Sequence, residues 1–212
     1  MGINERRERE KEQRTNDIID AAERVFAEKG VSAATMDDVA TEAELSKGTL
    51  YLYFKSKEEL YRAINVRGFM KLIELFREAI QSESTGLQQV RAIGRAYLNY
   101  SKDYPDYFNA MLHFESSDMV PDFEAGSIEA NCVAKGHDAL DLVVEALNNG
   151  IADGSIRKDV NPQKTAVILW GFCTGFIQLI AKKGEHFEDY HHLNTDDLIT
   201  ESFLLIKRSL ET

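Results

Sequence analysis

The sequence predicts an all-α protein, in which an N-terminal three-helix module with a helix-turn-helix precedes a larger C-terminal helical bundle. Most of the 212 residues place apolar side chains at helical spacing, and no long run alternates apolar and polar residues. Only three prolines interrupt the chain. Residues 35–60 contain a short helix, a turn and a second short helix, the proportions of a helix-turn-helix. We expect a first domain over residues 1–60 and a second over residues 61–212.

The first helix is expected to end at Lys29-Gly30, with Ile18, Ala22 and Phe26 on its apolar face. Upstream of it, residues 5–14 contain five basic and four acidic side chains, some of them at i,i+4 spacing. This charged stretch is either a solvated helical extension or frayed tail, or a basic arm that contacts a nucleic-acid groove. The sequence leaves both alternatives open.

Hydroxyl side chains mark the starts of the next three helices. Thr35 can cap a second helix with acidic residues in its first turn, and Ser46 can cap a short third helix that runs to about Phe54. Ser56 and Glu59 have the spacing of a capping box, which opens a long fourth helix. The connections between these helices are therefore very short.

The remainder of the chain is predicted to be helical as well. A long turn from residue 148 to residue 162 and a polar stretch at 184–195 separate its last segments. The expected helical segments are 86–102, 105–115, 124–149, 163–183 and 196–211.

The charge of the chain is unevenly distributed. With 36 acidic against 25 basic residues, the formal net charge is −11, which argues against a protein that coats nucleic acid or anionic membranes. Residues 45–57 nevertheless contain Lys47, Lys55 and Lys57 and no acidic residue. The sequence therefore predicts a small basic surface on an acidic protein.

Helical geometry separates the two faces of the third helix. Steps of about 100° per residue place Leu50 and Phe54 together as an inward pair and leave Gly48 and Leu52 on the opposite side. A leucine beside a glycine on an outward face suits a contact surface, where Leu52 could pack on a thymine methyl. Lys47 could then donate to guanine acceptors. Thr49, Tyr53 and Lys57 would suit phosphates; the alternative is a small three-helix module with solvated lysines.

This region closely resembles the TetR family of bacterial transcriptional regulators. The resemblance rests on TMDDVATEAELSKGTLYLYFKSKEELY at residues 35–61 and on the preceding helix IIDAAERVFAEKGV. It implies that Lys47, Gly48, Tyr51 and Leu52 face bases, and that phosphate contacts come from Thr35, Ser46, Thr49, Tyr53 and Lys57. Leu52 departs from the larger polar or aromatic residue that the family often has there, so no operator can be inferred from a relative.

The resemblance also implies a C-terminal domain for dimerisation. Residues 165–181 contain no charged side chain, and they are interrupted by too many polar residues for a membrane helix, so we expect a soluble helix buried on nearly all sides. The last helix carries a second apolar stripe, and the two helices together suggest a two-fold four-helix interface rather than a purely intrachain core. The candidate interface residues are Gly171, Gly175, Leu179, Ile199, Phe203, Ile206 and Leu210.

A cavity for a small-molecule effector is implied by the same resemblance. Aromatic and soft side chains in this domain could line such a cavity, although aromatic residues at helical spacing are also ordinary core residues. The acidic balance of the domain favours a neutral or cationic ligand. The candidate lining residues are Phe69, Ile73, Tyr97, Tyr100, Phe108, Met111, Phe114 and Trp170.

Other functional classes find little support. Cys132 and Cys173 are isolated, the histidines lack metal-binding spacing, and no catalytic or phosphate-binding motif is present, so we expect neither an enzyme nor a bound metal or cofactor. The N-terminus is too polar for a signal peptide, which predicts a cytoplasmic protein without a membrane partner.

We therefore expect a homodimeric, ligand-responsive regulator, most simply a repressor that leaves a near-palindromic DNA operator when a small-molecule effector binds. One alternative is an activator of the same fold that answers a protein partner or no ligand. The other is a helical small-molecule-binding protein or enzyme whose N-terminal module does not bind DNA.

Overall fold

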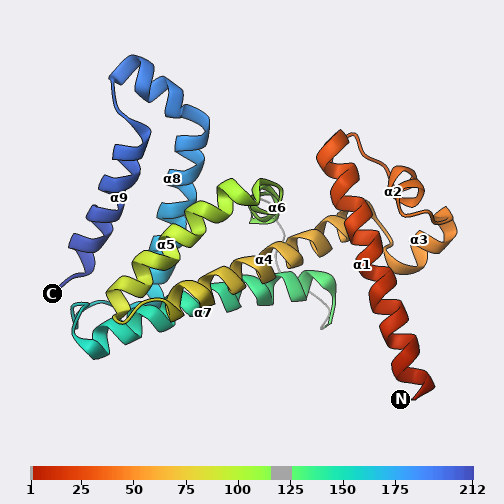
Figure 1. The fold of residues 1–212 in the computed structure, drawn as a ribbon, viewed down its shortest axis with the longest axis horizontal. Coiled ribbons are helices and arrows are strands. Elements are labelled where there is room, and N and C mark those ends of the chain that lie inside the picture. The colour runs from red at the N-terminus through yellow and green to blue at the C-terminus, as the bar shows by residue number, and fades with distance from the viewer. Residues whose placement is uncertain (1, 116–125) are drawn as a thin grey trace. The chain divides into compact units, whose positions relative to one another are not determined.

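The structure, a computed structural model, describes residues 2–115 and 126–212 apart from the side chains of residues 3, 114 and 115 (Figure 1). This part of the chain confirms the predicted all-α class, since its only β feature is an isolated bridge between Ile156 and Glu211. The described helices are α1 (Ile3–Lys29), α2 (Met36–Glu42), α3 (Lys47–Tyr53), α4 (Lys57–Gln81), α5 (Gly86–Asp103), α6 (Pro105–Glu115), α7 (Ile128–Asp153), α8 (Pro162–His191) and α9 (Thr195–Leu210). The expected start of a helix at residue 124 lies outside the described residues.

The caps predicted for the helix-turn-helix are present. Thr35 Oγ1 accepts the Asp38 amide at 3.2 Å, and Ser46 Oγ accepts the Thr49 amide at 3.1 Å. Ser56 Oγ accepts the Glu59 amide at 3.1 Å, as the first half of a capping box requires. The carboxylate of Glu59 accepts from the amide of Lys55 instead of that of Ser56, so the box closes one residue further upstream.

The chain divides into two compact units. The first contains residues 1–68 and 106–133, with α1 packed on α2 and α2 on α3. Its core brings together the apolar faces of α1, α2, α3 and the first half of α4, and Ile18, Leu50 and Leu60 are completely buried in it. This core fixes the orientation of α3, the second helix of the predicted helix-turn-helix.

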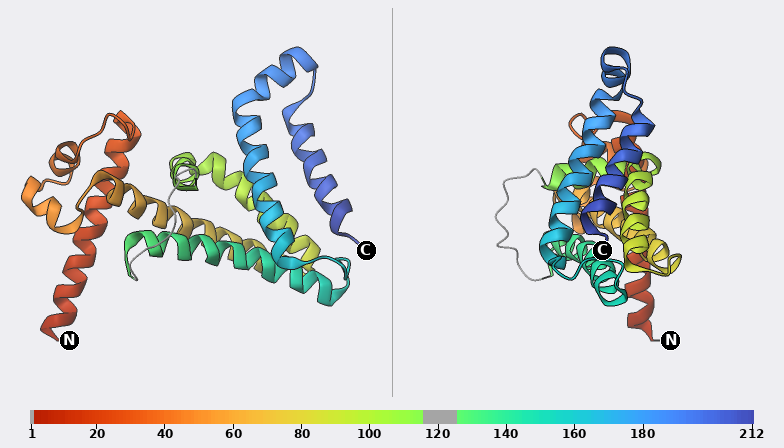
Figure 2. Two further views of the ribbon diagram at one scale, coloured as in Figure 1. Left: turned by 180° about the vertical axis from the view of Figure 1, so that it is seen from behind. Right: turned by 90° about the vertical axis from the view of Figure 1, so that its left-hand side faces the viewer.

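The second unit contains residues 69–105 and 134–212. In it, α5 packs against both α8 and α9, which run side by side in opposite directions (Figures 1 and 2). α5 and α7 cross so closely that a Cβ atom on Gly86 would overlap the backbone of Gly150. This crossing requires glycine because backbone atoms, unlike a flexible side chain, cannot move aside.

Two of the expected helix boundaries are wrong. α7 continues through Asn149-Gly150 to Asp153 and ends at Gly154, whose φ is +81°. α8 continues through most of the polar stretch to His191, where His192 ends it in the left-handed conformation. Residues 184–191 contain no proline, and polar side chains on the exposed side of a helix do not end it.

Residues 165–181, the uncharged segment of α8, were expected to be buried on nearly all sides, and within a single chain this expectation is wrong. Ile168 is 67% exposed, and the side chains of Val167, Phe172 and Leu179 are also exposed. By length and composition alone α8 is apolar enough to cross a membrane, a criterion that core helices of soluble proteins also meet. The apolar composition of α8 therefore reflects a face that residues 2–115 and 126–212 of its own chain leave uncovered.

Candidate nucleic-acid interface and internal cavity

The outward side of α3 forms a compact exposed surface, which we call the reading face: Lys47, Gly48, Tyr51 and Leu52. Leu52 is 83% exposed, whereas Leu50, two residues away, is completely buried. A Cβ atom on Gly48 would meet only the Ser46 hydroxyl, at 3.9 Å, so another surface can approach the backbone there. The structure thus brings the four predicted base-facing residues together on one exposed side of a short helix.

Lys47 is held by a neighbour on α2. Its ammonium lies 2.7 Å from the Asp37 carboxylate, and this hydrogen bond raises the pKa of Lys47. Both side chains are well exposed, so the ion pair is weak and can exchange for another anion at little cost. Asp37 therefore orients Lys47 without preventing it from binding a ligand.

The hydroxyl groups predicted to bind phosphate take part in helix caps. Thr35 donates to the Asp38 carboxylate at 2.7 Å, and the hydroxyls of Ser46 and Thr49 lie 2.8 Å apart. The pKa of Asp38 is lowered to about 2, first by its hydrogen bond from Lys29 and then by those from Thr35. Tyr53 is half-buried against the core of the unit.

Lys57, which was also predicted to contact phosphate, forms hydrogen bonds within its own unit. Its ammonium donates to three main-chain carbonyl oxygens in the connection between α1 and α2, those of Val31, Ser32 and Ala34, at 2.7, 3.3 and 3.0 Å. Lys57 therefore holds this connection against the start of α4. The exposed lysine at this end of the module is Lys55, whose side chain forms no ion pair among the described residues.

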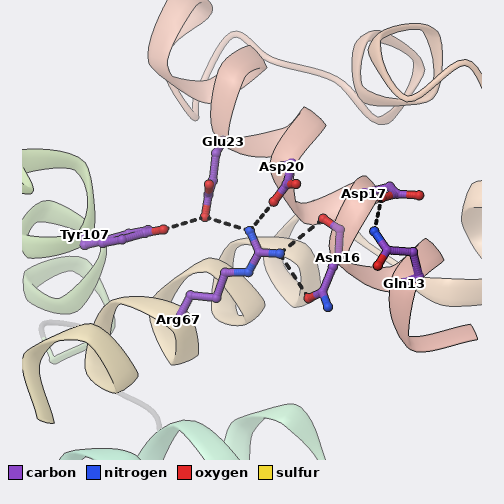
Figure 3. A network of polar contacts seen from close by, with 7 residues as sticks. All are labelled: Gln13, Asn16, Asp17, Asp20, Glu23, Arg67 and Tyr107. Atoms are coloured by element: carbon purple, nitrogen blue, oxygen red, sulfur yellow. Dashed lines mark hydrogen bonds and ion pairs between the residues drawn. The ribbon is translucent and has the colours of Figure 1, made fainter. Parts of the chain in front are cut away.

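A polar network ties α1 to α4 and α6 (Figure 3). Arg67 on α4 donates to Asp20 at 2.5 Å and to Glu23 at 3.3 Å, and its other nitrogen donates to the carbonyl and side-chain oxygens of Asn16. The Tyr107 hydroxyl on α6 donates to Glu23 at 3.0 Å. Burial, followed by the charge of Glu23, raises the pKa of Tyr107 to about 12. This network could not be predicted from a sequence motif, because its members are ordinary polar and charged residues that lie far apart in the chain.

The second unit contains a cavity of about 380 Å³ between α4, α5, α7, α8 and α9. Its wall is predominantly apolar, and Tyr97 and Trp170 are the predicted ligand-binding residues that line it. Most of the wall was not predicted from the sequence, and Phe203 and Ile206 were predicted to lie at a subunit interface instead. The apolar lining residues are Leu72, Phe76, Leu87, Val90, Ile93, Gly94, Tyr97, Ala139, Val143, Leu169, Trp170, Cys173, Phe203 and Ile206.

The other predicted ligand-binding residues lie elsewhere. Phe69, Ile73 and Tyr100 are buried in the second unit but do not line this cavity. Phe108 and Met111 are buried in the first unit. The side chain of Phe114 lies outside the described part of the structure.

Basic and amide side chains stand at the open side of the cavity. Arg91, Gln88 and Lys207 line it and are exposed, so they lie where it reaches solvent. Cys173 also lines the cavity, and burial raises the pKa of its thiol to about 11, which makes it an unreactive apolar group. The cavity thus combines an apolar interior with two cations at its opening.

The predicted interface residues divide into two groups. Gly171, Gly175 and Leu179 are exposed, and with Ile168 and Phe172 they fall within about 100° of one another around α8. We call these five residues the α8 apolar face. A Cβ atom on Gly171 or Gly175 would meet no atom of another described residue within 4 Å, so no described segment approaches the helix there.

The α9 residues instead face their own chain. Phe203 lies against Gly94 of α5, Ile206 lines the cavity, Ile199 is partly buried and Leu210 is buried. The stripe correctly marked a buried face, but α5 and α8 cover it. Leu205, which is 58% exposed, is the large apolar side chain that α9 leaves uncovered among the described residues.

Two family models match the chain. Residues 18–64 match "Bacterial regulatory proteins, tetR family", and residues 90–202, more than half of the chain, match "Tetracyclin repressor-like, C-terminal domain". The first match covers the helix-turn-helix with its reading face. The second covers most of the helices that surround the cavity.

Individual relatives agree with these matches. The chain is 35% identical over 90 residues to the transcriptional activator FasR of Mycolicibacterium smegmatis, a match that spans 42% of this chain and 41% of that protein. It is 26% identical over 154 residues to the transcriptional repressor KstR2 of Mycobacterium tuberculosis, covering 70% of this chain and 72% of the relative. The fold resembles the Bacillus subtilis regulator FadR in complex with stearoyl-CoA, with a TM-score of 0.68, 20% identity and coverage of 90% and 96% of the two chains.

Proposed function

Because this chain belongs to the TetR family of bacterial transcriptional regulators, we propose that it is a cytoplasmic repressor that binds a near-palindromic operator as a homodimer. In this proposal a small-molecule effector enters the cavity of the second unit and releases the operator. The helix-turn-helix reads one half-site per subunit, and two half-sites one helical turn apart require a dimer. The named relatives include both an activator and repressors, so a reporter assay must establish the sign of regulation.

The exposed reading face of α3 is the observation that carries the DNA-binding proposal. Leu52, which is 83% exposed, lies with the exposed Tyr51 and the open Gly48 on one side of α3, an apolar surface that a DNA groove can approach closely. Lys47, Gly48, Tyr51 and Leu52 would contact bases. Phosphates would approach the caps at Thr35, Ser46 and Thr49, together with Tyr53, and Lys55 replaces Lys57 as the lysine for that role.

The α8 apolar face supports the homodimer. Its exposed isoleucine, phenylalanine and leucine surround Gly171 and Gly175, which would let a second helix approach closely. Packing the same face of two subunits across a two-fold axis would cover both copies at once. Leu205 on α9 lies exposed in the same unit and would extend the interface.

The cavity supports an amphipathic effector. Its apolar wall suits a hydrocarbon chain, and Arg91 and Lys207 at the opening suit an anionic head group. The FadR neighbour was solved with stearoyl-CoA, a ligand with both features. We therefore propose a long-chain acyl thioester or a related anionic amphiphile, in place of the neutral or cationic ligand that the net charge suggested.

Selection of duplexes from a random pool by the purified full chain tests the DNA-binding proposal. We expect a near-palindromic sequence whose affinity falls linearly with salt on logarithmic axes. Stearoyl-CoA should weaken this complex, and Arg91→Gln should weaken stearoyl-CoA binding about tenfold while leaving operator affinity unchanged. Arg95→Gln, an exposed change one turn along the same helix and outside the cavity, is the matched control. A chain that enriches no sequence would refute the proposal.

The dimer is tested separately by light scattering. Ile168→Glu would place a charge in the middle of the interface and should yield monomers, whereas Gln163→Glu, on another side of α8, should remain dimeric. A dimer that survives both Ile168→Glu and Gly175→Asp would move the interface away from the α8 apolar face.

A further inference from the structure

The first turns of α1 extend beyond the helical core of their unit. α1 begins at Ile3, and its N-terminal end projects beyond the other helices of its unit (Figure 1). Every described side chain from Asn4 to Arg14 is exposed. The core of the unit begins further along the helix, at Ile18. At 1.5 Å per residue, residues 4–14 form a rod about 16 Å long that no other described helix covers.

Most of the charges on this rod are sorted by side. Steps of 100° per residue place Arg7, Lys11 and Arg14 within about 60° of one another, and we call them the basic stripe. Glu5, Glu8 and Glu12 fall within a similar arc on a different side and form the acidic stripe. The remaining three, Arg6, Arg9 and Glu10, lie in the arc between the two stripes. A helical extension that serves only solubility has no need of this separation, because mixed charges all round would hydrate equally well.

The basic side chains are available to a ligand. Among the described residues Arg7 and Lys11 form no ion pair, and Arg14 reaches only Asp17, at 4.0 Å. Arg6 is the arginine of this segment that is closely paired, to Glu10 at 2.7 Å, and it lies outside the stripe. The two cations that would bind phosphate most directly are therefore unpaired.

The basic stripe also lies on a defined side of α1. It continues the line of Ile18, Ala22 and Val25, which are buried in the core that α1 shares with α2, α3 and the first half of α4. The stripe is thus on the side of α1 that carries this core. Because the stripe belongs to the same compact unit as the reading face, DNA is its expected ligand rather than an acidic partner protein.

We propose that the basic stripe of α1 binds the DNA backbone beside each half-site, outside the base pairs that α3 reads. This inference rests on the proposed operator binding and adds to it a second, sequence-independent surface. Neutralising three phosphates makes affinity fall more steeply with salt, because each contact releases condensed counterions. The stripe would therefore strengthen binding only to DNA that extends past the half-site.

The test compares Arg7→Gln/Lys11→Gln/Arg14→Gln with the wild-type chain on selected duplexes of two lengths. Glutamine preserves helix propensity, and circular dichroism checks that α1 remains folded. On a duplex with long flanks the homodimer loses six contacts, three per half-site, which should lower the salt slope by about 5.4. The affinity difference should then change about 1,800-fold between 50 and 200 mM salt. On a duplex trimmed to the half-sites, the two proteins should agree within about twofold.

Glu5→Gln/Glu8→Gln/Glu12→Gln is the matched control, because it changes three charges on the acidic stripe and should leave the salt slope unaltered. Equal salt slopes for the wild-type and basic-stripe variants on the long duplex would overturn the inference while leaving operator binding intact. A slope change of the same size in both triple variants would assign the effect to net charge and also overturn it. A wild-type chain that selects no DNA would overturn the proposed function and this inference together.

Discussion

Truncating the two leucines of α3 should affect different properties of the protein, although they lie only two residues apart. Leu50 is completely buried and Leu52 is 83% exposed. Leu50→Ala removes packed carbon atoms from the core and should lower the free energy of unfolding by about 3 kcal/mol. Leu52→Ala removes atoms that touch only water in the free protein, so the free energy of unfolding should change by less than about 0.5 kcal/mol.

The same substitution at Leu52 should weaken DNA binding. Three carbon atoms removed from a surface that is buried in the complex correspond to about 2 kcal/mol per half-site, or about a 30-fold higher Kd for each half-site. For a dimer on the full operator the two losses add to about 4 kcal/mol, or about a 900-fold higher Kd. Urea unfolding followed by circular dichroism measures the first quantity, and fluorescence anisotropy with a selected duplex measures the second. An operator affinity within twofold of wild type for Leu52→Ala would refute the orientation of α3 toward bases.

Three further outcomes follow from individual contacts. Asp37→Asn removes the ion pair that holds Lys47 and should raise the affinity for random-sequence DNA about fivefold in fluorescence anisotropy. The free energy of unfolding in urea should change by less than about 1 kcal/mol. Gly86→Ala forces a Cβ atom into the backbone of Gly150 and should destabilise the protein by about 3 kcal/mol in urea unfolding; an unchanged midpoint would contradict the close crossing. Because the folded protein raises the pKa of Tyr107 to about 12, the neutral hydroxyl adds to the free energy of unfolding below pH 10, and this contribution is lost as the pH rises to about 12. Denaturant titrations at a series of pH values should therefore show a smaller loss of stability above pH 10 for Tyr107→Phe than for the wild-type chain.

Local features of the fold were predictable from sequence because they depend on neighbours in the chain. The caps at Thr35, Ser46 and Ser56 require only a hydroxyl three residues before an amide, and all three are present. The inward and outward sides of α3 follow from a fixed turn per residue, so Leu50 and Leu52 were placed correctly. The reading face of a short helix is therefore largely determined by its own sequence.

Features that depend on which element covers a face were not predictable in the same way. An apolar stripe shows that a side is buried, but not whether the cover comes from the same chain or from another. Phe203 and Ile206 have the spacing of an interface helix, yet α5 and the cavity occupy their side. Lys57 is similar, since only the folded chain brings three carbonyl oxygens of a distant connection to its ammonium.

The cavity was the least predictable feature because it is space left by five helices and not a property of any one of them. Aromatic spacing identified Tyr97 and Trp170, but it also selected Phe108 and Met111, which belong to the core of the other unit. The net charge of the domain also does not describe the charge at the cavity. The C-terminal part of the chain is acidic, whereas Arg91 and Lys207 are the charged residues that line the cavity.

α8 connects the proposed effector site with the proposed dimer interface by its geometry alone. Leu169, Trp170 and Cys173 line the cavity on one side of this helix, while Ile168 and Phe172 belong to the exposed face on another. A ligand that shifts the cavity side of α8 therefore also shifts the side that a second subunit would cover, and a ligand that holds α8 in place holds both sides. Such coupling acts only if the ligand prefers one arrangement of the dimer, and it is reciprocal, so a chain made monomeric at Ile168 should bind the effector with altered affinity. Unchanged effector affinity in that monomer would mean that release of DNA does not pass through α8.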